Sequence, residues 1–398
     1  MLEGVNVALG VTGSIAAVKT VELAHELRRR GATVRAITTD AATGIVHPWA
    51  LEFATDNPVV TEITGAVEHV DLCGDDGWAD VLLIAPATAN TVGKIAAAID
   101  DTPVTTAATT ALGAGVPVVV APAMHRPMYD HPGVLDAIER VEEWGVAFVD
   151  PRIEEGKAKI ASLDAIALAT ARAATPDPLA DRHVVVTSGA TVESVDPIRT
   201  LSNRSSGRTG RAVARACYVR GADVTLLHGA VGSGGFDRDG RFATGGVPYA
   251  TLERVESAAE MTDAAVDATA AADALVSAAA ISDYTVERRP EKIPSGRESL
   301  TLELTPTPKL VDTVREERPD LPVVGFKAET DADDERLVER ARETRDRVGM
   351  SFVVANDASV MGADATRALL VGDDVTEYEG DKAGLGARVA TELTAVLE

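Results

Sequence analysis

The stretch VNVALGVTGSIAAVKTVELAHELRRRGATVRAIT (residues 5–38) decides the fold of the first half of the chain. Residues 5–11 are an apolar run that predicts a strand, and residues 12–14 are small turn residues. Leucines then recur at helical spacing, and residues 33–38 predict a second strand. A strand, a turn, a helix and a strand in this order form a βαβ unit, which implies a parallel sheet.

The same order of elements continues beyond this unit. Further strands are expected at residues 81–85, 116–121 and 146–149, and a helix at residues 163–173. The segment ATPDPLAD (residues 174–181) contains two prolines and two aspartates, which disfavour a continuing helix and predict a linker.

The second half opens in the same way as the first. Residues 184–187 predict a strand, a turn follows at Ser188-Gly189-Ala190, and a helix ending at Gly221 precedes a strand at residues 223–227. We therefore expect two α/β domains, one over residues 1–173 and one over residues 182–398, as the length of 398 residues also suggests.

The composition limits which kinds of binding partner and which cellular compartment are expected for this protein. The formal net charge is -24, and only eight of the 38 basic residues are lysines. Nucleic acid is therefore excluded as a partner, and an acidic, lysine-poor surface predicts a protein adapted to a salt-rich cytosol. Cys73 and Cys217 are too few for a disulfide framework or a zinc site. No signal peptide or membrane span is expected, so the protein is predicted to be cytoplasmic.

The first turn, GVTGSIAAVK (residues 10–19), places small residues where a helix follows a strand. Free N–H groups and the helix dipole favour a phosphate at such a turn. The full G-x-G-x-x-G fingerprint is absent, so a plain tight turn explains this segment equally well.

Three further segments point to a flavin. These are HVDL (residues 69–72), APATANT (residues 85–91) and APAMHRPMYDH (residues 121–131). Together with the first turn they resemble the homo-oligomeric flavin-containing cysteine decarboxylases, in the same order along the chain. The resemblance implies FMN as cofactor and His69 as a catalytic residue. The FMN contacts that it implies are Gly13, Ser14 and Ile15 for the phosphate, together with Thr39, Thr88, Asn90 and Met124.

On its own His69 would more often be a structural histidine, and only the resemblance favours catalysis. The chemistry does need such a group, because loss of CO2 from a cysteine carboxylate leaves an unstabilised carbanion. If a flavin first oxidises the thiol, the oxidised group can accept the electrons that loss of CO2 leaves behind. A nearby base and a nearby acid must then remove and donate the protons.

Two departures from the bacterial pattern concern the same site. His125 stands where bacterial members usually carry Asn, and it is able to hydrogen-bond the substrate carboxylate. The segment EEGKAK (residues 154–159) replaces a substrate lid that usually contains a Cys. Lys157 and Lys159 either bind substrate anions or are solvated lid residues. We predict that Lys159 or His125 supplies the proton in place of the lid Cys, because Cys73 lies in what looks like a short insertion.

The segment TSGATVESVDPIRTLSNRSSGRTG (residues 187–210) resembles the phosphopantothenate-cysteine ligase domain over nearly its whole length. The segments AAAISDY (278–284), PEKI (290–293), VVGFKAET (323–330) and VAND (354–357) follow in the family order. The first domain and the second together resemble the bifunctional flavoproteins of coenzyme A biosynthesis, of the archaeal, salt-adapted type.

A ligase of this kind activates a carboxylate as an acyl-nucleotide with release of pyrophosphate, and cysteine's amine then displaces the nucleotide. Such a site needs N–H donors around phosphates, a cation, and a donor at the acyl oxygen. We assign Lys292 as the cation and Asn203 as the donor, both catalytic. Gly189, Ser205, Ser206 and Gly207 are predicted to supply the N–H donors. The resemblance implies that the nucleotide and intermediate site also contains Asn203, Asp283, Lys292, Pro308, Lys309, Leu310, Val311 and Phe326.

Without the resemblance, Asn203 reads as a turn residue and Asp283 as a strand-end cap. Arg345 and Arg347 lie near the position of lysines in the family, but an Arg-rich helix is usually a solvated face. The residues that contact a metal cannot be named from the sequence.

The resemblance implies a flavodoxin-like first domain and a Rossmann-like second domain, each a three-layer α/β/α sandwich. It also implies 4'-phosphopantothenate, L-cysteine and a nucleoside triphosphate with Mg2+ as substrates. The family uses CTP in bacteria and ATP in eukaryotes; we expect CTP, and ATP stays open. Dimeric ligase domains and trimeric flavin domains imply a large homo-oligomer, up to a dodecamer.

Two other functions stay open at this point. A nicotinamide-dependent oxidoreductase would want a complete glycine fingerprint with an acidic residue further on, and neither turn is complete. A flavin-binding regulatory subunit that has lost decarboxylation is compatible with the missing lid Cys.

Overall fold

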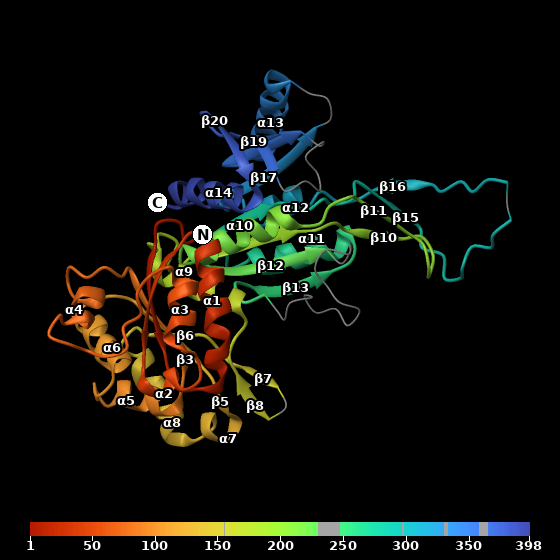
Figure 1. Cartoon of the computed structure of the whole chain (residues 1–398). Coiled ribbons are helices and arrows are strands. Elements are labelled where there is room, and N and C mark those ends of the chain that lie inside the picture. The colour runs from red at the N-terminus through yellow and green to blue at the C-terminus, as the bar shows by residue number, and fades with distance from the viewer. Residues whose placement is uncertain (155, 230–246, 297, 330–332, 358–364) are drawn as a thin grey trace. The chain divides into compact units, whose positions relative to one another are not determined.

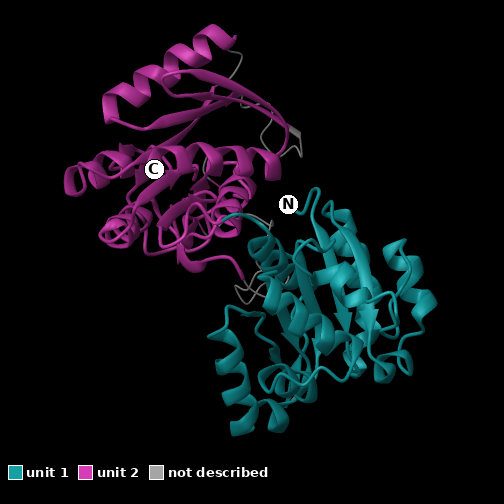
Figure 2. Cartoon of the chain, turned by 90° about the vertical axis from the view of Figure 1, so that its left-hand side faces the viewer, with its two compact units in different colours: residues 1–176 teal, residues 177–398 magenta. Residues whose placement is uncertain are grey.

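The computed structural model describes residues 1–398 except 155, 230–246, 297, 330–332 and 358–364 (Figure 1). The chain divides into two compact units, Met1–Pro176 and Asp177–Glu398 (Figure 2). Among the described residues, no helix combines the length and the apolar character that a membrane crossing requires.

Unit 1 is built on a parallel five-stranded sheet of order β2-β1-β3-β4-β6. Its strands are β1 (Asn6–Val11), β2 (Thr33–Thr38), β3 (Val81–Ala87), β4 (Val118–Pro122) and β6 (Ala147–Phe148). Its helices are the 3-10 helix η1 (Ile15–Lys19), α1 (Thr20–Arg29), α2 (Asp40–Thr43), α3 (Pro48–Thr55), α4 (Glu68–Cys73), α5 (Ala89–Ala96), α6 (Pro103–Ala114), α7 (Arg126–Tyr129), α8 (Pro132–Glu142) and α9 (Leu163–Ala174). The predicted parallel α/β architecture is confirmed.

The strand order of unit 1 locates its binding edge. β3 and β4 are buried along their whole length, as expected for central strands of a parallel sheet. The chain runs from β1 outward to β2 and then returns to β3 on the other side of β1. Ligands of open α/β sheets bind at the carboxyl ends of the strands where the order reverses in this way. The segments after β1, β3 and β4 all end at this edge.

A small antiparallel sheet of order β5-β8-β7 accompanies this edge and was not predicted. It consists of β5 (Met124–His125), β7 (Arg152–Glu154) and β8 (Lys157–Lys159), with His125 opposite Lys157. The expected lid segment therefore forms a hairpin that pairs with the strand after β4 (Figure 1). Glu155, which lies in the predicted lid segment, is outside the described residues.

Unit 2 contains an eight-stranded sheet of order β13-β12-β9-β14-β17-β18-β19-β20. The pairs from β13 to β18 are parallel, and β18–β19 and β19–β20 are antiparallel. The strands are β9 (His183–Ser188), β12 (Asp223–Gly229), β13 (Thr251–Val255), β14 (Ala274–Ser277), β17 (Val323–Glu329), β18 (Phe352–Asp357), β19 (Ala365–Val371) and β20 (Val375–Asp381). The helices are α10 (Arg208–Val219), α11 (Ala258–Thr269), α12 (Leu310–Glu317), α13 (Asp334–Val348) and α14 (Lys382–Leu397).

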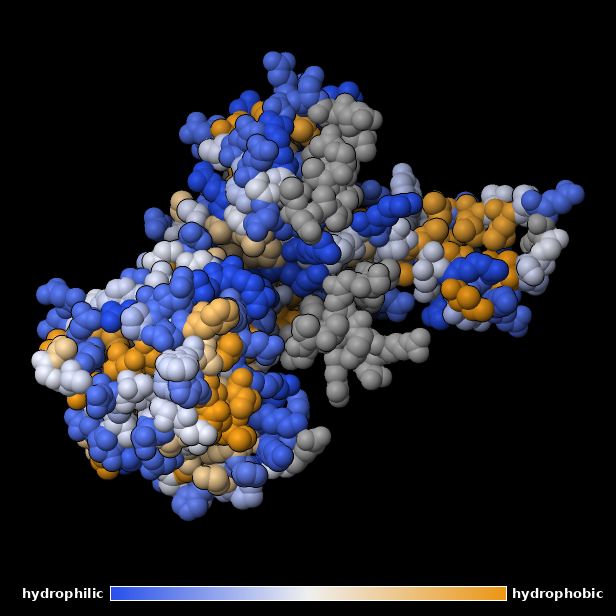
Figure 3. All heavy atoms as spheres, viewed as in Figure 1, coloured by the Kyte–Doolittle hydropathy of each residue, from blue (hydrophilic) through white to orange (hydrophobic). Residues whose placement is uncertain are grey.

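Two short hairpins extend from unit 2. One pairs β10 (Val192–Ser194) with β11 (Thr200–Ser202), and the other pairs β15 (Tyr284–Val286) with β16 (Leu304–Pro306). Figure 3 shows apolar side chains on this extension. Ile198, Tyr284 and Leu304 are exposed large apolar residues there.

The segment predicted as a linker, residues 174–181, belongs partly to unit 2. α9 ends at Ala174, and the backbone N–H of Leu179 donates to the carbonyl of Arg220 at 2.9 Å. The side chain of Leu179 is fully buried. The second half of the segment expected as a linker is thus packed against unit 2.

Candidate active sites

A cavity of about 390 Å3 lies at the carboxyl edge of the sheet in unit 1. It is lined by residues from the turn after β1, from the start of α5, from the segment after β4 and from the lid hairpin. The lining residues are Gly13, Ser14, Ile15, Ala16, Lys19, Thr88, Ala123, Met124, His125, Met128, Arg152, Lys157, Ala158, Lys159 and Ile160. Seven residues predicted for the flavin and its chemistry are therefore gathered in one place.

The turn after β1 is shaped by close backbone approach. A Cβ on Gly13 would lie 2.6 Å from the Cβ of Ala41, so no larger residue fits without movement. Ser14 caps η1 by accepting from the N–H of Ala16 at 3.4 Å, and its hydroxyl donates to the carbonyl of Ala123 at 3.0 Å. The capping hydroxyl thereby ties the turn after β1 to the segment after β4.

Thr88 holds the start of α5, where its side chain accepts from the N–H of Thr91 at 3.1 Å. Asn90 lies in the first turn of this helix, is exposed and does not line the cavity. Thr39 also lies outside the lining; it caps α2, and its N–H donates to the carbonyl of Val11 at 3.1 Å. Two of the seven predicted flavin contacts thus lie beside the cavity rather than in its wall.

The lid hairpin brings cations to the cavity. Lys159 donates to Glu154 at 3.1 Å, and Arg152 donates to the other oxygen of the same carboxylate at 3.0 Å. Lys157 and Lys19 are exposed in the lining. The cavity wall therefore carries Lys19, Arg152, Lys157 and Lys159, of which Arg152 and Lys159 are paired with Glu154 outside the lining, and this excess of positive charge suits an anionic ligand.

His69 is not part of this cavity. It is half-buried in α4, it does not line the cavity, and within the described part of the chain its Nδ1 is buried without a hydrogen-bond partner. Cys73, at the end of the same helix, is fully buried in the apolar core, and burial raises the pKa of its thiol to about 12. Cys73 therefore stays protonated and lies away from the lid.

The residues around this cavity fit FMN. The volume lies within the range of about 300–1,000 Å3 that is usual for cofactor sites. Ile15, Met124 and Met128 supply an apolar wall for a planar ring. The glycine turn and the neighbouring lysines supply a place for a phosphate.

In unit 2 two glycines of the ligase motif face each other. Gly189 has φ +84° and Gly207 has φ +69°, a conformation that favours glycine. A Cβ on Gly207 would lie 2.7 Å from the backbone nitrogen of Gly189, and the hydroxyl of Ser188 donates to the carbonyl of Gly207 at 2.8 Å. Ser205 accepts from the N–H of Gly207 at 3.4 Å. The carbonyl of Ser206 accepts from Arg211 at 2.9 Å.

Asn203 lies beside this glycine pair. Its side-chain amide donates to the carbonyl of Ala280 at 3.1 Å, and the N–H of Ala280 donates to the carbonyl of Gly189 at 2.8 Å. The side chain of Asn203 is exposed. The structure thus brings together three segments that the sequence motifs placed in one site.

A second group of predicted residues lines a smaller cavity of about 140 Å3. Its lining includes Asp283, Pro308, Lys309, Leu310 and Val311, together with Ile281, Ser282, Thr307, Asp312, Arg347 and Met350. Lys309 forms an ion pair with Asp283. Lys292 and Phe326 do not line this cavity; Lys292 is exposed and Phe326 is half-buried on β17.

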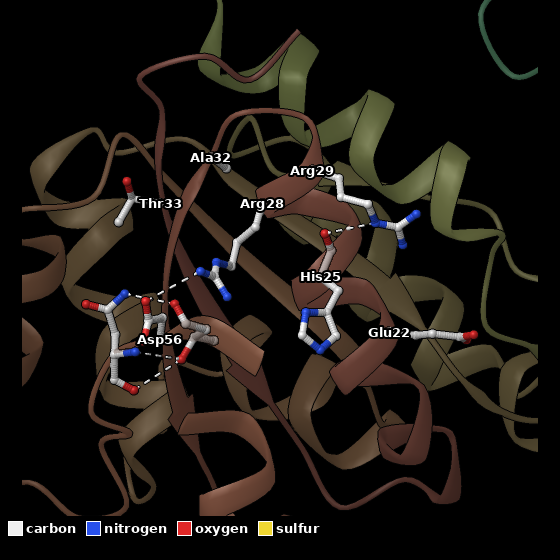
Figure 4. A pocket seen from close by; sticks show the side chains of 9 residues that line it. Glu22, His25, Arg28, Arg29, Ala32, Thr33 and Asp56 are labelled. Atoms are coloured by element: carbon white, nitrogen blue, oxygen red, sulfur yellow. Dashed lines mark hydrogen bonds and ion pairs between the residues drawn. The ribbon is translucent and has the colours of Figure 1, made fainter. Parts of the chain in front are cut away.

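A broader groove of about 800 Å3 lies elsewhere in unit 1 and contains none of the predicted site residues. Figure 4 shows Arg28 beside Asp56, with their nitrogen and oxygen 3.6 Å apart, and the ring of His25 in the same groove. Arg28 also donates to the carbonyl of Ala54 at 2.9 Å. Its cation is thus satisfied within the fold. No group of three or more His, Cys, Asp or Glu residues suited to a metal ion occurs in the described ranges.

Two family models match the chain. The model described as Flavoprotein matches residues 1–175, and the model described as DNA/pantothenate metabolism flavoprotein C-terminal domain matches residues 179–397. The coenzyme A biosynthesis bifunctional protein CoaBC of Thermococcus kodakarensis is 46% identical over 94% of this chain and 90% of that protein. The CoaBC protein of Methanocaldococcus jannaschii is 33% identical over 100% of this chain and 95% of that protein.

The chain belongs to the CoaBC family. The resemblance stated from the sequence is confirmed, and with it the enzyme class: a bifunctional flavoprotein of coenzyme A biosynthesis with a decarboxylase and a ligase activity. One solved structure, that of the FMN-dependent cysteine decarboxylase SpaF, is 32% identical, with 44% of this chain and 100% of that chain covered and a TM-score of 0.39.

The sequence analysis did not single out several residues that line the candidate sites. Lys19 and Arg152 line the cavity of unit 1, and only their closeness to quoted motifs would have pointed to them. Arg347, interpreted as part of a solvated face, lines the smaller cavity of unit 2 and pairs with Asp312 at 3.0 Å, whereas Arg345 pairs with Asp373 at 3.3 Å.

His228 is a further residue that the sequence did not single out. It is buried beneath the glycine pair, with its Cε1 2.6 Å from a Cβ built on Gly207. Burial, together with Arg211 and Arg254, lowers its pKa to about 4. The ring is therefore neutral near pH 7 and forms part of the floor under Gly189 and Gly207.

Proposed function

We propose that this CoaBC chain carries out two consecutive reactions, one in each domain. The domain of residues 182–398 joins L-cysteine to 4'-phosphopantothenate, and the domain of residues 1–173 decarboxylates the product to 4'-phosphopantetheine, with residues 174–181 between them. The observation that supports this assignment most is the convergence of separate motif segments on one cavity at the binding edge of the first sheet.

In the first domain we propose FMN as the flavin. Gly13, Ser14 and Ile15 would hold its phosphate, and Thr88 and Met124 would contact the ring. Bound FMN supplies the oxidation of the substrate thiol that makes loss of CO2 feasible. The turn offers one phosphate cradle at the start of a helix, which suits a mononucleotide.

The chain's own residues bind the substrate and move protons. We propose that Lys19 and Lys157, which are exposed in the cavity wall, bind the substrate phosphate and that His125, which also lines the cavity, hydrogen-bonds the substrate carboxylate. Lys159 lines the cavity and donates to Glu154 at 3.1 Å. We propose that Lys159, or His125 across the same hairpin, donates the proton that the missing lid Cys would supply.

His69 requires a different explanation, because it lies outside the cavity of its own chain. We propose that a neighbouring copy presents its His69 to this cavity, in a trimer of flavin domains. Ile15 in the cavity wall is 79% exposed, and Trp49 and Phe53 on α3 are 76% and 78% exposed. Large apolar side chains exposed in this way indicate an interface.

In the second domain the carboxylate of 4'-phosphopantothenate attacks the α-phosphorus of the nucleotide and displaces pyrophosphate. The amine of cysteine then attacks the acyl carbon, loses a proton and releases the nucleoside monophosphate. We propose that the N–H groups at Gly189, Ser205, Ser206 and Gly207 bind phosphate oxygens and that Asn203 donates to the acyl oxygen. Lys292 would offset the charge that develops during activation.

The smaller cavity of unit 2 is our candidate for the nucleoside. Asp283, Pro308, Lys309, Leu310 and Val311 line it. Phe326 is proposed to contact the same nucleotide from β17. We propose CTP with Mg2+ as the activating pair, with ATP as the alternative.

The resemblance to the family also supports a proposal for the assembly and the cellular setting. We propose dimeric ligase domains, in which the exposed apolar side chains of the hairpin extension are covered, combined with trimeric flavin domains in an assembly of up to twelve chains. We also propose a salt-rich cytoplasm as the working environment, because the net charge is -24.

The full chain should be assayed with 4'-phosphopantothenate, L-cysteine and either CTP or ATP. We expect a yellow protein that releases FMN and forms 4'-phosphopantetheine, and mass analysis of the nucleoside monophosphate identifies the nucleotide. A chain purified in high salt without flavin, or one that forms the cysteine amide but never loses CO2, would refute the decarboxylase half. No amide with either nucleotide would refute the ligase half.

A further inference from the structure

Asp196 is a buried carboxylate at the turn of the β10–β11 hairpin, and it is 2% exposed. One oxygen accepts from the backbone N–H groups of Ile198 and Arg199, both at 2.8 Å. Its other oxygen accepts from the backbone N–H of Ile293 at 3.0 Å and forms an ion pair with Arg199. The hydrogen bond from Ile293 to Asp196 joins two segments that are 97 residues apart in the sequence.

The segment around Ile293 is held at several points by this turn. The carbonyl of Ile293 accepts from the Arg199 guanidinium at 3.1 Å, and its side chain is 3% exposed. Four residues earlier, the N–H of Arg289 donates to the carbonyl of Val195 at 2.9 Å. Residues 289–293 therefore lie beside residues 195–199 and are hydrogen-bonded to them.

Lys292 lies within this attached segment. Its side chain is exposed, whereas the backbone of the next residue is hydrogen-bonded on both sides. Asn203 follows the same hairpin, because β11 ends at Ser202. The turn around Asp196 therefore connects the segment that carries the proposed cation to the segment that carries the proposed acyl donor.

The carboxylate is suited to this task because it stays ionised. Although burial opposes ionisation, hydrogen bonds from Ile293, Ile198 and Arg199 hold the pKa of Asp196 well below its usual range. Hydrogen bonds to an ionised acceptor are about twice as strong as neutral ones. A neutral amide of the same shape would still fill the space but would hold the Ile293 N–H less tightly.

We propose that Asp196 is a positioning residue of the ligase, which fixes the backbone of Ile293 so that Lys292 is aimed at the activated carboxylate. This inference rests on the proposed role of Lys292. Misplacement of a charged group by about 1 Å can lower a rate on the order of a hundredfold. Asp196 itself need not touch substrate.

The test is a double-mutant cycle in the full chain with Asp196→Asn and Lys292→Ala. The measured quantity is the rate of acyl-nucleotide formation from 4'-phosphopantothenate and CTP, followed by pyrophosphate release. We expect Asp196→Asn alone to lower kcat roughly tenfold or more, with KM for CTP changed less than about threefold. In the Lys292→Ala background the same change should lower the rate less than about twofold, because the positioned group is already gone.

Glu193→Gln is the matched control. Glu193 is another buried carboxylate of β10, and it accepts from the N–H of Ala258 at 2.9 Å and from the hydroxyl of Thr285 at 2.6 Å. Any loss of rate that Glu193→Gln causes should be the same factor in the wild-type chain and in the Lys292→Ala chain. If Asp196→Asn does not fold, Asp196→Glu, which keeps the charge but shifts the oxygens, enters the same cycle.

The outcomes distinguish the proposed role of Lys292 from the proposed positioning role of Asp196. A Lys292→Ala chain with an unchanged rate would overturn the proposed role of Lys292 itself. An impaired Lys292→Ala chain in which Asp196→Asn costs the same factor as in the wild type would overturn the positioning role alone. Loss of the Asp196 effect in the Lys292→Ala background supports it.

Discussion

Gly13 lies so close to Ala41 that a Cβ on the glycine would approach the Ala41 Cβ to 2.6 Å. Position 13 therefore has no room for a side chain, and Gly13 is one of the residues that line the cavity proposed for FMN. Ser14 ties the same turn to Ala123, which also lines the cavity, so we expect a displacement at Gly13 to alter the cavity wall.

Gly13→Ala should therefore weaken flavin binding. Relief of such an overlap typically costs about 1–3 kcal/mol, which corresponds to roughly 5- to 150-fold weaker binding. The flavin absorbance per chain after dialysis measures this loss. Gly113→Ala in α6 is the control, because a Cβ there meets nothing within 4 Å; equal flavin retention in both variants would show that the turn does not hold the cofactor.

The lid variants test which group replaces the missing Cys. Cys73→Ser should be nearly silent, because Cys73 is buried in the core and its pKa is raised to about 12. Lys159→Ala or His125→Ala should slow turnover to 4'-phosphopantetheine by about a hundredfold, the usual value of a positioned proton donor. A Cys73→Ser chain that stalls with reduced flavin and an oxidised enethiol product would reassign the proton donor to Cys73.

Mixing two inactive variants tests the proposal that His69 of one copy acts in the cavity of a neighbouring copy. His69→Ala and Lys159→Ala chains should each decarboxylate poorly while they retain flavin. After subunit exchange, mixed assemblies should regain a fraction of the wild-type rate, because some cavities then combine an intact Lys159 with an intact His69 from another copy. No recovery, despite exchange shown by native mass spectrometry, would mean that His69 acts within its own chain or not at all.

The buried His228 predicts a pH dependence of stability in unit 2. Its pKa is about 4 in the fold, against 6.5 in an exposed histidine. Between these values the unfolded chain binds a proton that the folded chain does not, so stability falls as the pH drops from 6.5 toward 4, by up to about 3 kcal/mol.

His228→Gln should flatten this dependence. Trp49, Trp78 and Trp144 are the three tryptophans of the chain and all lie in unit 1, so their fluorescence reports unit 1 and circular dichroism is needed for unit 2. Urea unfolding at about pH 7 and about pH 5.5 measures the difference. An unchanged difference in the variant would remove His228 as its cause.

The sequence predicted the five strands of the first sheet, β9 and β12 of the second, and most of the residues that line the cavity of unit 1, and the reason is topological. Parallel strands end at a common edge, so motifs that follow β1, β3 and β4 are bound to meet there. Gly13, Thr88 and Met124 could be assigned on that ground together with the resemblance.

What the sequence could not predict depends on contacts between distant segments. Nothing near Asp196 shows that its carboxylate accepts from Ile293, 97 residues later. The position of His69 outside its own cavity and the burial of His228 under Gly207 are likewise properties of the packed fold. Arg347 is solvated as expected, but that it also lines the smaller cavity of unit 2 depends on the packing of α13 and could not be predicted from a charged helix face.

The central claim is that one chain carries two chemically independent sites, with Asn203 in the ligase site alone. The decisive measurement follows product formation by Asn203→Ala from two starting points: 4'-phosphopantothenate with cysteine and CTP, and supplied phosphopantothenoylcysteine. Because a lost oxyanion-type donor costs on the order of a hundredfold or more in rate, the first mixture should give almost no product. The second should give 4'-phosphopantetheine at the wild-type rate. Full activity from the first mixture, or equal loss from both, would contradict the account.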